Sequence, residues 1–189
     1  MIPRELVMGI LCLFPISEIV LGLLKRANSR ESSVHDQGTL RVIWVVVSVS
    51  LVIASIVKNV SSTRLPIPVE LSDMLSITLT ISGLALRLLS IVTLGRYFTV
   101  NVAIHPDQHV ITTGPYRFIR HPSYTGLLVA FLGLGMYFAN WLSLLFLLVP
   151  ITVATLYRIK KEEEILLKVL GPPYQAYCKE TKRLIPWLF

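Results

Sequence analysis

The stretch GPYRFIRHPSYTG, residues 114–126, leads directly into an apolar segment that ends at Ala139. It places arginines, a histidine and tyrosines immediately before a helix apolar enough to enter a bilayer. A second charged run, RIKKEEE at residues 158–164, follows the next apolar segment, and only Asn140 separates the two apolar segments. Helices joined by so short a turn run antiparallel, so we expect both charged runs at one membrane face. The sequence therefore predicts a polar site at that face.

The composition is that of a membrane protein. Hydrophobic residues make up 53% of the 189 residues and charged residues only 15%, and the mean hydropathy is +0.67. Soluble domains contain about 25% charged residues. No shift in composition marks a separate soluble domain, so we expect a single integral membrane domain over residues 1–189.

Five apolar stretches predict an all-α fold with five transmembrane helices. They lie at Leu6–Leu24, Leu40–Val57, Leu71–Leu94, Tyr124–Ala139 and Trp141–Tyr157. About 20 helical residues are needed to cross a bilayer, so the last two stretches are short, and we expect them to form a helical hairpin. Pro150 should bend or loosen the fifth helix. Residues 1–94 would then hold three membrane helices, and residues 95–189 a cofactor-binding loop, the hairpin and a C-terminal cytosolic segment.

The lysines and arginines of the loops predict the orientation. With the N-terminus outside, most of them fall on the inner side together with the C-terminus, and only Arg4, Lys58 and Arg64 fall outside. The positive-inside rule then predicts a cytosolic C-terminus. Because topology and anionic lipids account for the net charge of +7, we expect no nucleic-acid partner.

Glu18 falls inside the first predicted membrane helix, and Arg87 falls well inside the third. Such residues usually face a cavity or a partner, or extend toward the interface. The sequence leaves open which applies here, and whether the two side chains pair.

The segment from Gly95 to Ser123 is too polar for another span and long for a connector, which favours a functional loop. Three of the four histidines, His105, His109 and His121, lie in it. Asp107 is its only carboxylate and it contains no cysteine, so we expect no metal site.

Arg158 and Glu162 are four residues apart and so share one face of a helix. The plainer interpretation is a solvated ion pair. The alternative is a site in which the arginine holds an anionic substrate and the glutamate holds a cofactor.

Three segments together resemble the isoprenylcysteine carboxyl methyltransferase family. They are HVITTGPY at residues 109–116, RHPSYTG at 120–126, and RIKKEEEILLKVLGPPYQAY at 158–177. The resemblance implies S-adenosylmethionine as methyl donor, S-adenosylhomocysteine as product, and a cofactor pocket at the cytosolic face between the loop and the last helix. By position, it assigns cofactor contacts to His109, Val110, Ile111, Thr112, Tyr116, His121, Pro122, Ser123, Tyr124 and Glu162.

The same resemblance assigns Arg158 to the carboxylate of the acceptor. The implied reaction is O-methylation of a membrane-embedded lipidic acceptor, most simply the α-carboxylate of a prenylated cysteine, to a methyl ester. The implied partners are the bilayer and a lipidated protein, peptide or small molecule.

Other functions stay open at this stage. A phospholipid amine N-methyltransferase would need a base, for which His121 or Glu163 are candidates. A membrane reductase using a nicotinamide cofactor is less well supported, because Gly133-x-Gly135 lacks the third glycine of a dinucleotide site. Together with Gly126 and Ala130, these glycines instead predict close helix packing. A nonenzymatic scaffold or transporter is disfavoured because the polar residues gather at one face rather than through the bilayer.

Overall fold

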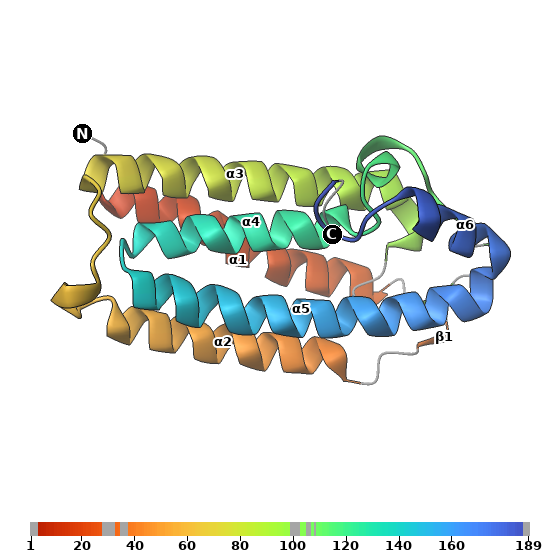
Figure 1. Cartoon of the computed structure of the whole chain (residues 1–189), viewed down its shortest axis with the longest axis horizontal. Coiled ribbons are helices and arrows are strands. Elements are labelled where there is room, and N and C mark those ends of the chain that lie inside the picture. The colour runs from red at the N-terminus through yellow and green to blue at the C-terminus, as the bar shows by residue number, and fades with distance from the viewer. Residues whose placement is uncertain are drawn as a thin grey trace.

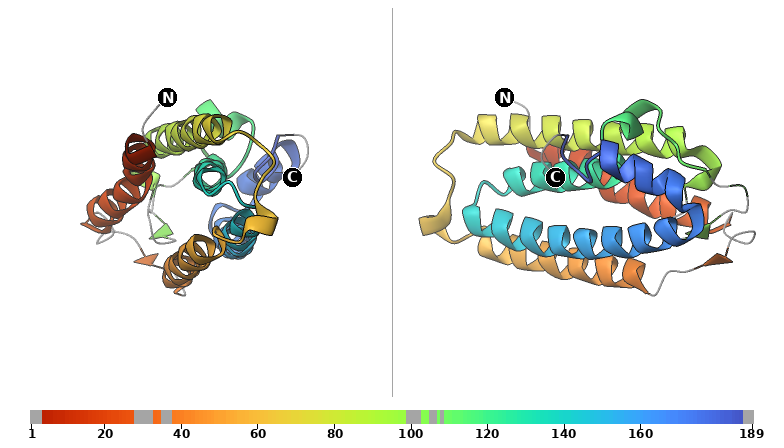
Figure 2. Two further views of the ribbon diagram at one scale, coloured as in Figure 1. Left: turned by 90° about the vertical axis from the view of Figure 1, so that its left-hand side faces the viewer. Right: turned by 45° about the vertical axis from the view of Figure 1, so that its right-hand side comes forward.

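The structure, a computed structural model, describes residues 4–27, 33–34, 38–98, 103–104, 107 and 109–186. Long helices lie side by side in a bundle (Figures 1 and 2). The α-helices are α1 (Arg4–Ala27), α2 (Thr39–Val57), α3 (Val69–Leu94), α4 (Pro122–Tyr137), α5 (Trp141–Leu170) and α6 (Pro172–Glu180). Short 3₁₀ turns are η2 (Ser61–Thr63), η3 (Gly95–Tyr97) and η4 (Gly114–Arg117).

One element departs from the predicted all-α fold within these residues. Strand β1 (Ser33–Val34) pairs antiparallel with β2 (Ala103–Ile104), which joins the segment before α2 to the segment after α3. The pair is two residues long on each side, so the fold is otherwise helical.

Four of the described helices are long and apolar enough to cross a membrane, namely α1, α2, α3 and α5. Helix α4 has only 16 residues, fewer than the about 20 that a bilayer core requires. The fifth span in the sequence-based prediction therefore stays a prediction.

Helix α5 is longer than the fifth apolar stretch, which ends at Tyr157. The helix continues through the charged run and ends only at Gly171, whose φ of 58° is left-handed. Pro150 lies inside this continuous helix. The charged residues of the predicted site are thus carried on the same rigid element as the preceding apolar segment.

The predicted hairpin of α4 and α5 is present, and Asn140 forms its turn. The Asn140 side chain is fully buried and accepts a hydrogen bond from the Ser143 backbone N–H at 3.2 Å, which caps α5. Its amide group donates to Val60 O at 3.1 Å and to Thr63 Oγ1 at 2.8 Å. The single residue between the two apolar segments therefore also ties the hairpin to the connection between α2 and α3.

Helices α3 and α4 pack with their backbones in contact, and this confirms the prediction from the small residues. A Cβ atom on Gly126 would lie 2.5 Å from the Gly83 carbonyl oxygen, and one on Gly133 would lie 2.5 Å from Thr80 Oγ1. No larger side chain fits at either position. The close contact fixes the start of α4, where the polar run ends, against α3.

Candidate active site

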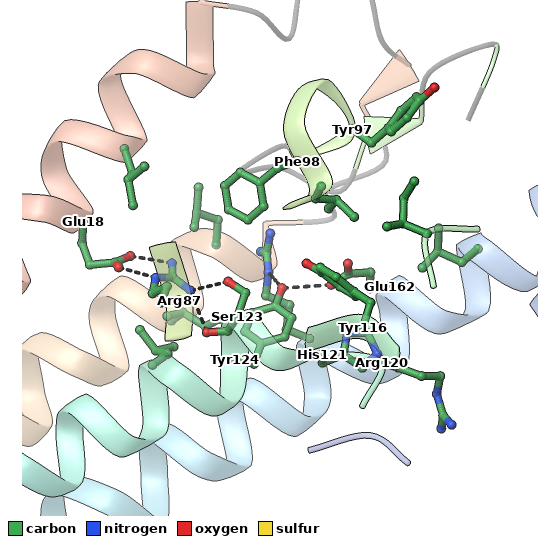
Figure 3. A pocket seen from close by; sticks show the side chains of 18 of the residues that line it. Glu18, Arg87, Tyr97, Phe98, Tyr116, Arg120, His121, Ser123, Tyr124 and Glu162 are labelled. Carbon is green, nitrogen blue, oxygen red and sulfur yellow. Dashed lines mark hydrogen bonds and ion pairs between the residues drawn. The ribbon is translucent and has the colours of Figure 1, made fainter. Parts of the chain in front are cut away.

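A cavity of about 190 Å³ has Tyr174 and Tyr177 of α6 in its lining, and Figure 3 shows it from close by. Helix α6 lies at one end of the bundle (Figure 1). Part of the cavity wall is apolar and comes from α1, α2 and α4: Leu21, Leu40, Ile43, Trp44, Val47, Leu127 and Phe131. The rest is largely polar and aromatic, from the segment before α4, the start of α4 and the end of α5. The pocket thus joins an apolar compartment to a polar one.

Most of the predicted site residues meet in this pocket although they come from three parts of the chain. The lining includes His109, Val110, Ile111, Tyr116, His121, Ser123, Tyr124, Arg158 and Glu162.

Two predicted cofactor residues, Thr112 and Pro122, are not among the lining residues. Thr112 is exposed, and Pro122 is fully buried in the first turn of α4. The Pro122 ring serves the helix start, where a missing N–H costs nothing. The presence of Pro122 in the sequence motif is therefore explained by its position in the first turn of α4, without a contact to the pocket.

The phenol of Tyr124 lies between Arg158 and Glu162. Arg158 Nε donates to Tyr124 Oη at 2.8 Å, and Tyr124 Oη donates to Glu162 Oε2 at 2.9 Å (Figure 3 shows the second bond). Arg158 also donates from Nη1 to Thr39 Oγ1 at 2.8 Å and is only 4% exposed. Arg158 and Glu162 therefore lie on one face of α5, as predicted, and Tyr124 bonds to both of them.

Glu18 and Arg87 form an ion pair in the pocket wall, which answers the question that the sequence left open. Arg87 Nη2 lies 2.6 Å from Glu18 Oε2, and Arg87 Nε contacts Glu18 Oε1 (Figure 3). Arg87 Nη1 donates to Ser123 Oγ at 2.9 Å and to the Ser123 carbonyl at 3.2 Å. The pair links α1, α3 and the start of α4.

Glu163 lies at the centre of a second charged cluster. Its carboxylate accepts from Arg120 Nε at 2.9 Å, from Arg183 Nη2 at 2.8 Å and from His121 Nε2 at 3.3 Å. The side chain is 8% exposed. Glu163 therefore orients the pocket histidine and forms ion pairs with two neighbouring arginines, whose charges it balances in part.

Residues 182–184 pair with the backbone at the start of α4. Arg120 N–H donates to Lys182 O at 2.7 Å and His121 N–H to Arg183 O at 3.0 Å. Thr125 Oγ1 donates to Leu184 O at 2.8 Å. The second bond satisfies the N–H group of the N-cap residue of α4, and the three bonds together hold residues 182–184 against the start of α4.

Tyrosines of η4 and α6 complete the polar wall. Tyr177 Oη donates to the Tyr116 carbonyl at 2.6 Å, and both residues line the pocket together with Tyr174. Burial raises the pKa of Tyr177 to about 12, and burial together with the nearby Glu162 charge raises the pKa of Tyr116. Both hydroxyls therefore stay protonated at neutral pH, and that of Tyr177 acts as a hydrogen-bond donor.

Arg120, Arg183 and Thr39 were not assigned a role from the sequence, and Glu163 was considered only as a base for the alternative amine methyltransferase. Arg120, Glu163 and Arg183 form one ion cluster, and Thr39 is a partner of Arg158. For Glu18 and Arg87, the feature of the sequence that could indicate an ion pair was the presence of opposite charges in two apolar stretches. In the described part of the chain, no three His, Cys, Asp or Glu side chains gather into a metal-binding group, and His105 lies outside the described residues.

The pocket is partly apolar, lies within a bundle of membrane helices, and contains arginine, glutamate, histidine and tyrosine side chains. This combination is typical of an enzyme whose active site lies in the membrane. Residues 75–168 match the model of the isoprenylcysteine carboxyl methyltransferase (ICMT) family. Through this segment, the chain belongs to that family.

Sequence relatives agree with the match. The chain is 34% identical over 114 residues to the probable protein-S-isoprenylcysteine O-methyltransferase of Oryza sativa subsp. japonica, covering 59% of this chain and 60% of that protein. It is 33% identical over 106 residues to the protein-S-isoprenylcysteine O-methyltransferase of Schizosaccharomyces pombe, covering 55% and 45%. The alignments thus span about half to three fifths of these relatives.

Two further likenesses extend the comparison. Methanethiol S-methyltransferase 1 of Bradyrhizobium diazoefficiens is 38% identical over 72 residues, which cover 38% of this chain and 24% of that protein. The fold resembles the structure of the eukaryotic intramembrane Ras methyltransferase ICMT, with a TM-score of 0.57, 24% identity, and coverage of 76% of this chain and 52% of that one. The chain is a multi-pass membrane protein of this fold.

Proposed function

We propose that the chain is an S-adenosylmethionine-dependent carboxyl methyltransferase whose acceptor is a membrane-embedded lipidated carboxylate, with the α-carboxylate of a prenylated cysteine as the leading candidate. The observation that carries the proposal is the single pocket in which the family-pattern residues and the apolar side chains of α1 and α2 meet. A lipid chain fits the apolar part, and a water-soluble donor fits the polar part.

The residues present suit the donor. Its adenosine and amino-acid groups need donors, acceptors and aromatic faces, and the polar wall offers Tyr116, His121, Tyr124, Glu162 and His109. Glu162 is held in place by Tyr124 and can accept from a hydroxyl or ammonium group. When bound, the donor supplies an electrophilic methyl group on a sulfonium sulfur.

The residues of the chain would promote transfer by alignment and by exclusion of water. A carboxylate acceptor is already ionised, so the site needs no strong general base. Arg158 can orient such a carboxylate, and Tyr124 fixes the position of the arginine relative to Glu162 through its two hydrogen bonds. Charge is neutralised as sulfonium and carboxylate react, and a drier site therefore favours the transition state over the separated ions.

The pocket end is proposed to face the cytosol, with α4 as a fifth span. Arg96, Arg117, Lys160 and Lys179 lie on segments at the pocket end of the bundle, whereas Arg4, Lys58 and Arg64 lie on segments at the opposite end (Figure 1). This asymmetry supports the positive-inside orientation and gives the soluble donor access from the cytosol.

A specific test is donor binding followed by turnover. Protein purified in detergent should bind S-adenosylhomocysteine in a calorimetric titration. It should also transfer a labelled methyl group from S-adenosylmethionine to a prenylated cysteine, and base hydrolysis of the resulting methyl ester should release the label as methanol. Binding of NADPH in place of either sulfur compound would contradict the proposal.

A second acceptor class has one observation in its favour, the similarity to a methanethiol S-methyltransferase. A thiol acceptor would give a base-stable thioether, so the methanol-release step separates the two classes. Phospholipid amines, the runner-up from the sequence, give base-stable products as well and are separated from thiols by mass.

A further inference from the structure

We infer that Glu18 selects among lipid head groups at Arg87: its carboxylate is the resident partner of Arg87, and a carboxylate that enters the pocket must compete with it to bind Arg87 rather than Arg158. The inference deepens the proposed function and rests on it for the entry of a lipidic acceptor into this pocket. It concerns the preference of the pocket for charged or uncharged head groups.

Both members of the pair line the pocket and lie on apolar helices. The Glu18 and Arg87 side chains are only 14% and 11% exposed. An ionised side chain at such depth is costly unless a partner neutralises it. Each residue therefore holds the other strongly, and an incoming charge has to displace an existing bond.

The geometry of the pair is the one in which arginine binds carboxylates. Nε and Nη2 of Arg87 both face the two oxygens of Glu18, which is the two-point arrangement that arginine also forms with carboxylate ligands. The remaining nitrogen, Nη1, is engaged by Ser123. Glu18 thus occupies the edge of Arg87 that a lipid carboxylate would use.

Glu18 comes from the part of the chain outside the family match. Arg87 and Ser123 lie within residues 75–168, whereas Glu18 lies on α1. Helix α1 also gives the pocket two of its apolar neighbours, Leu21 and Gly22. A lipid chain lying against α1 would therefore bring its head group close to the Glu18–Arg87 pair.

The consequence is that two lipids of equal chain length, one a carboxylate and one its methyl ester, should differ in how their binding responds to a change at Glu18. A carboxylate is repelled by Glu18 and finds Arg87 already neutralised, whereas a methyl ester carries no charge and is unaffected. Removal of the Glu18 charge should therefore tighten the binding of a carboxylate and leave the binding of its ester nearly unchanged.

The test compares oleate with methyl oleate as probes of the full chain in detergent. For Glu18→Gln, we expect the dissociation constant of oleate to fall about tenfold or more, because a charge-assisted bond becomes available. Methyl oleate should change by less than about threefold, the scale of an uncharged contact. Glu5→Gln, which removes the same charge from the exposed opposite end of α1, should match the wild type for both lipids.

Equal changes for oleate and methyl oleate, or no change for either, would overturn the inference. If Glu18→Gln is too unstable for titration, its melting temperature with each lipid is decisive: oleate should stabilise it more than it stabilises the wild type, and methyl oleate should not. Failure of the wild type to bind S-adenosylhomocysteine would refute the proposed function, and the lipid comparison would still be informative.

Discussion

Tyr124 donates a hydrogen bond from its phenol to the carboxylate of Glu162, across 2.9 Å, while its oxygen accepts one from Arg158. The two charged residues of α5 are thus held in a fixed relation by a side chain of α4. The resemblance assigns them to different ligands, so this tyrosine connects the proposed donor and acceptor sites.

Replacement of Tyr124 by phenylalanine removes only the hydroxyl. We expect turnover to fall by about tenfold or more, because a hydrogen bond to a charged group contributes about 1.5 to 3 kcal/mol. The melting temperature should also fall, because the buried Arg158 and the half-buried Glu162 lose their common partner. Radiometric methyl transfer at saturating donor and acceptor gives the measurement, and unchanged turnover would show that the phenol has no role.

Arg158 and Glu162 should have separable effects. Arg158→Ala should nearly abolish transfer while S-adenosylhomocysteine affinity stays within a few-fold, whereas Glu162→Ala should weaken that affinity by about 1.5 to 3 kcal/mol. Calorimetry and turnover on both variants decide the matter. Equal and mild effects of the two substitutions would show that neither side chain binds the ligand proposed for it.

Glu163 should matter for stability far more than its neighbour Glu164. Glu163→Gln leaves Arg120 and Arg183 without their buried counter-charge, and breaking such a pair costs about 3 to 5 kcal/mol. Glu164→Gln makes the same chemical change at a half-exposed residue that pairs with Lys161. Melting temperature and hydrogen exchange at residues 181–186 measure the difference, and equal shifts for the two variants would contradict the central place of Glu163.

The contact of α3 with α4 gives a steric prediction. Gly126→Ala places a methyl group 2.5 Å from the Gly83 carbonyl, and overpacking of this kind costs about 1 to 3 kcal/mol. Gly9→Ala on α1 has open space around it and serves as the control. Thermal unfolding of both variants in one detergent tests the prediction, and a Gly126→Ala protein as stable as the control would refute the packing.

The hairpin and the helix-packing glycines could be predicted from local sequence patterns, and the family resemblance supplied nine of the residues that line the pocket. Asn140 between two apolar stretches predicts a turn, and the run at residues 114–126 places Tyr116, His121 and Tyr124 together. The partners Thr39 and Arg183 could not be predicted. They meet Arg158 and Glu163 only after the chain has folded, and no local pattern carries that information.

Residues 182–184 bond to the backbone of Arg120 and His121 and supply Arg183 to Glu163, which has a consequence for synthesis in the cell. While a ribosome is still making this segment, α1 to α5 can already be inserted, but the wall behind His121 is absent. The pocket can therefore reach its final shape only after residue 184 has left the ribosome. A nascent or prematurely terminated chain that lacks residues 182–184 would therefore enter the membrane with an incomplete pocket.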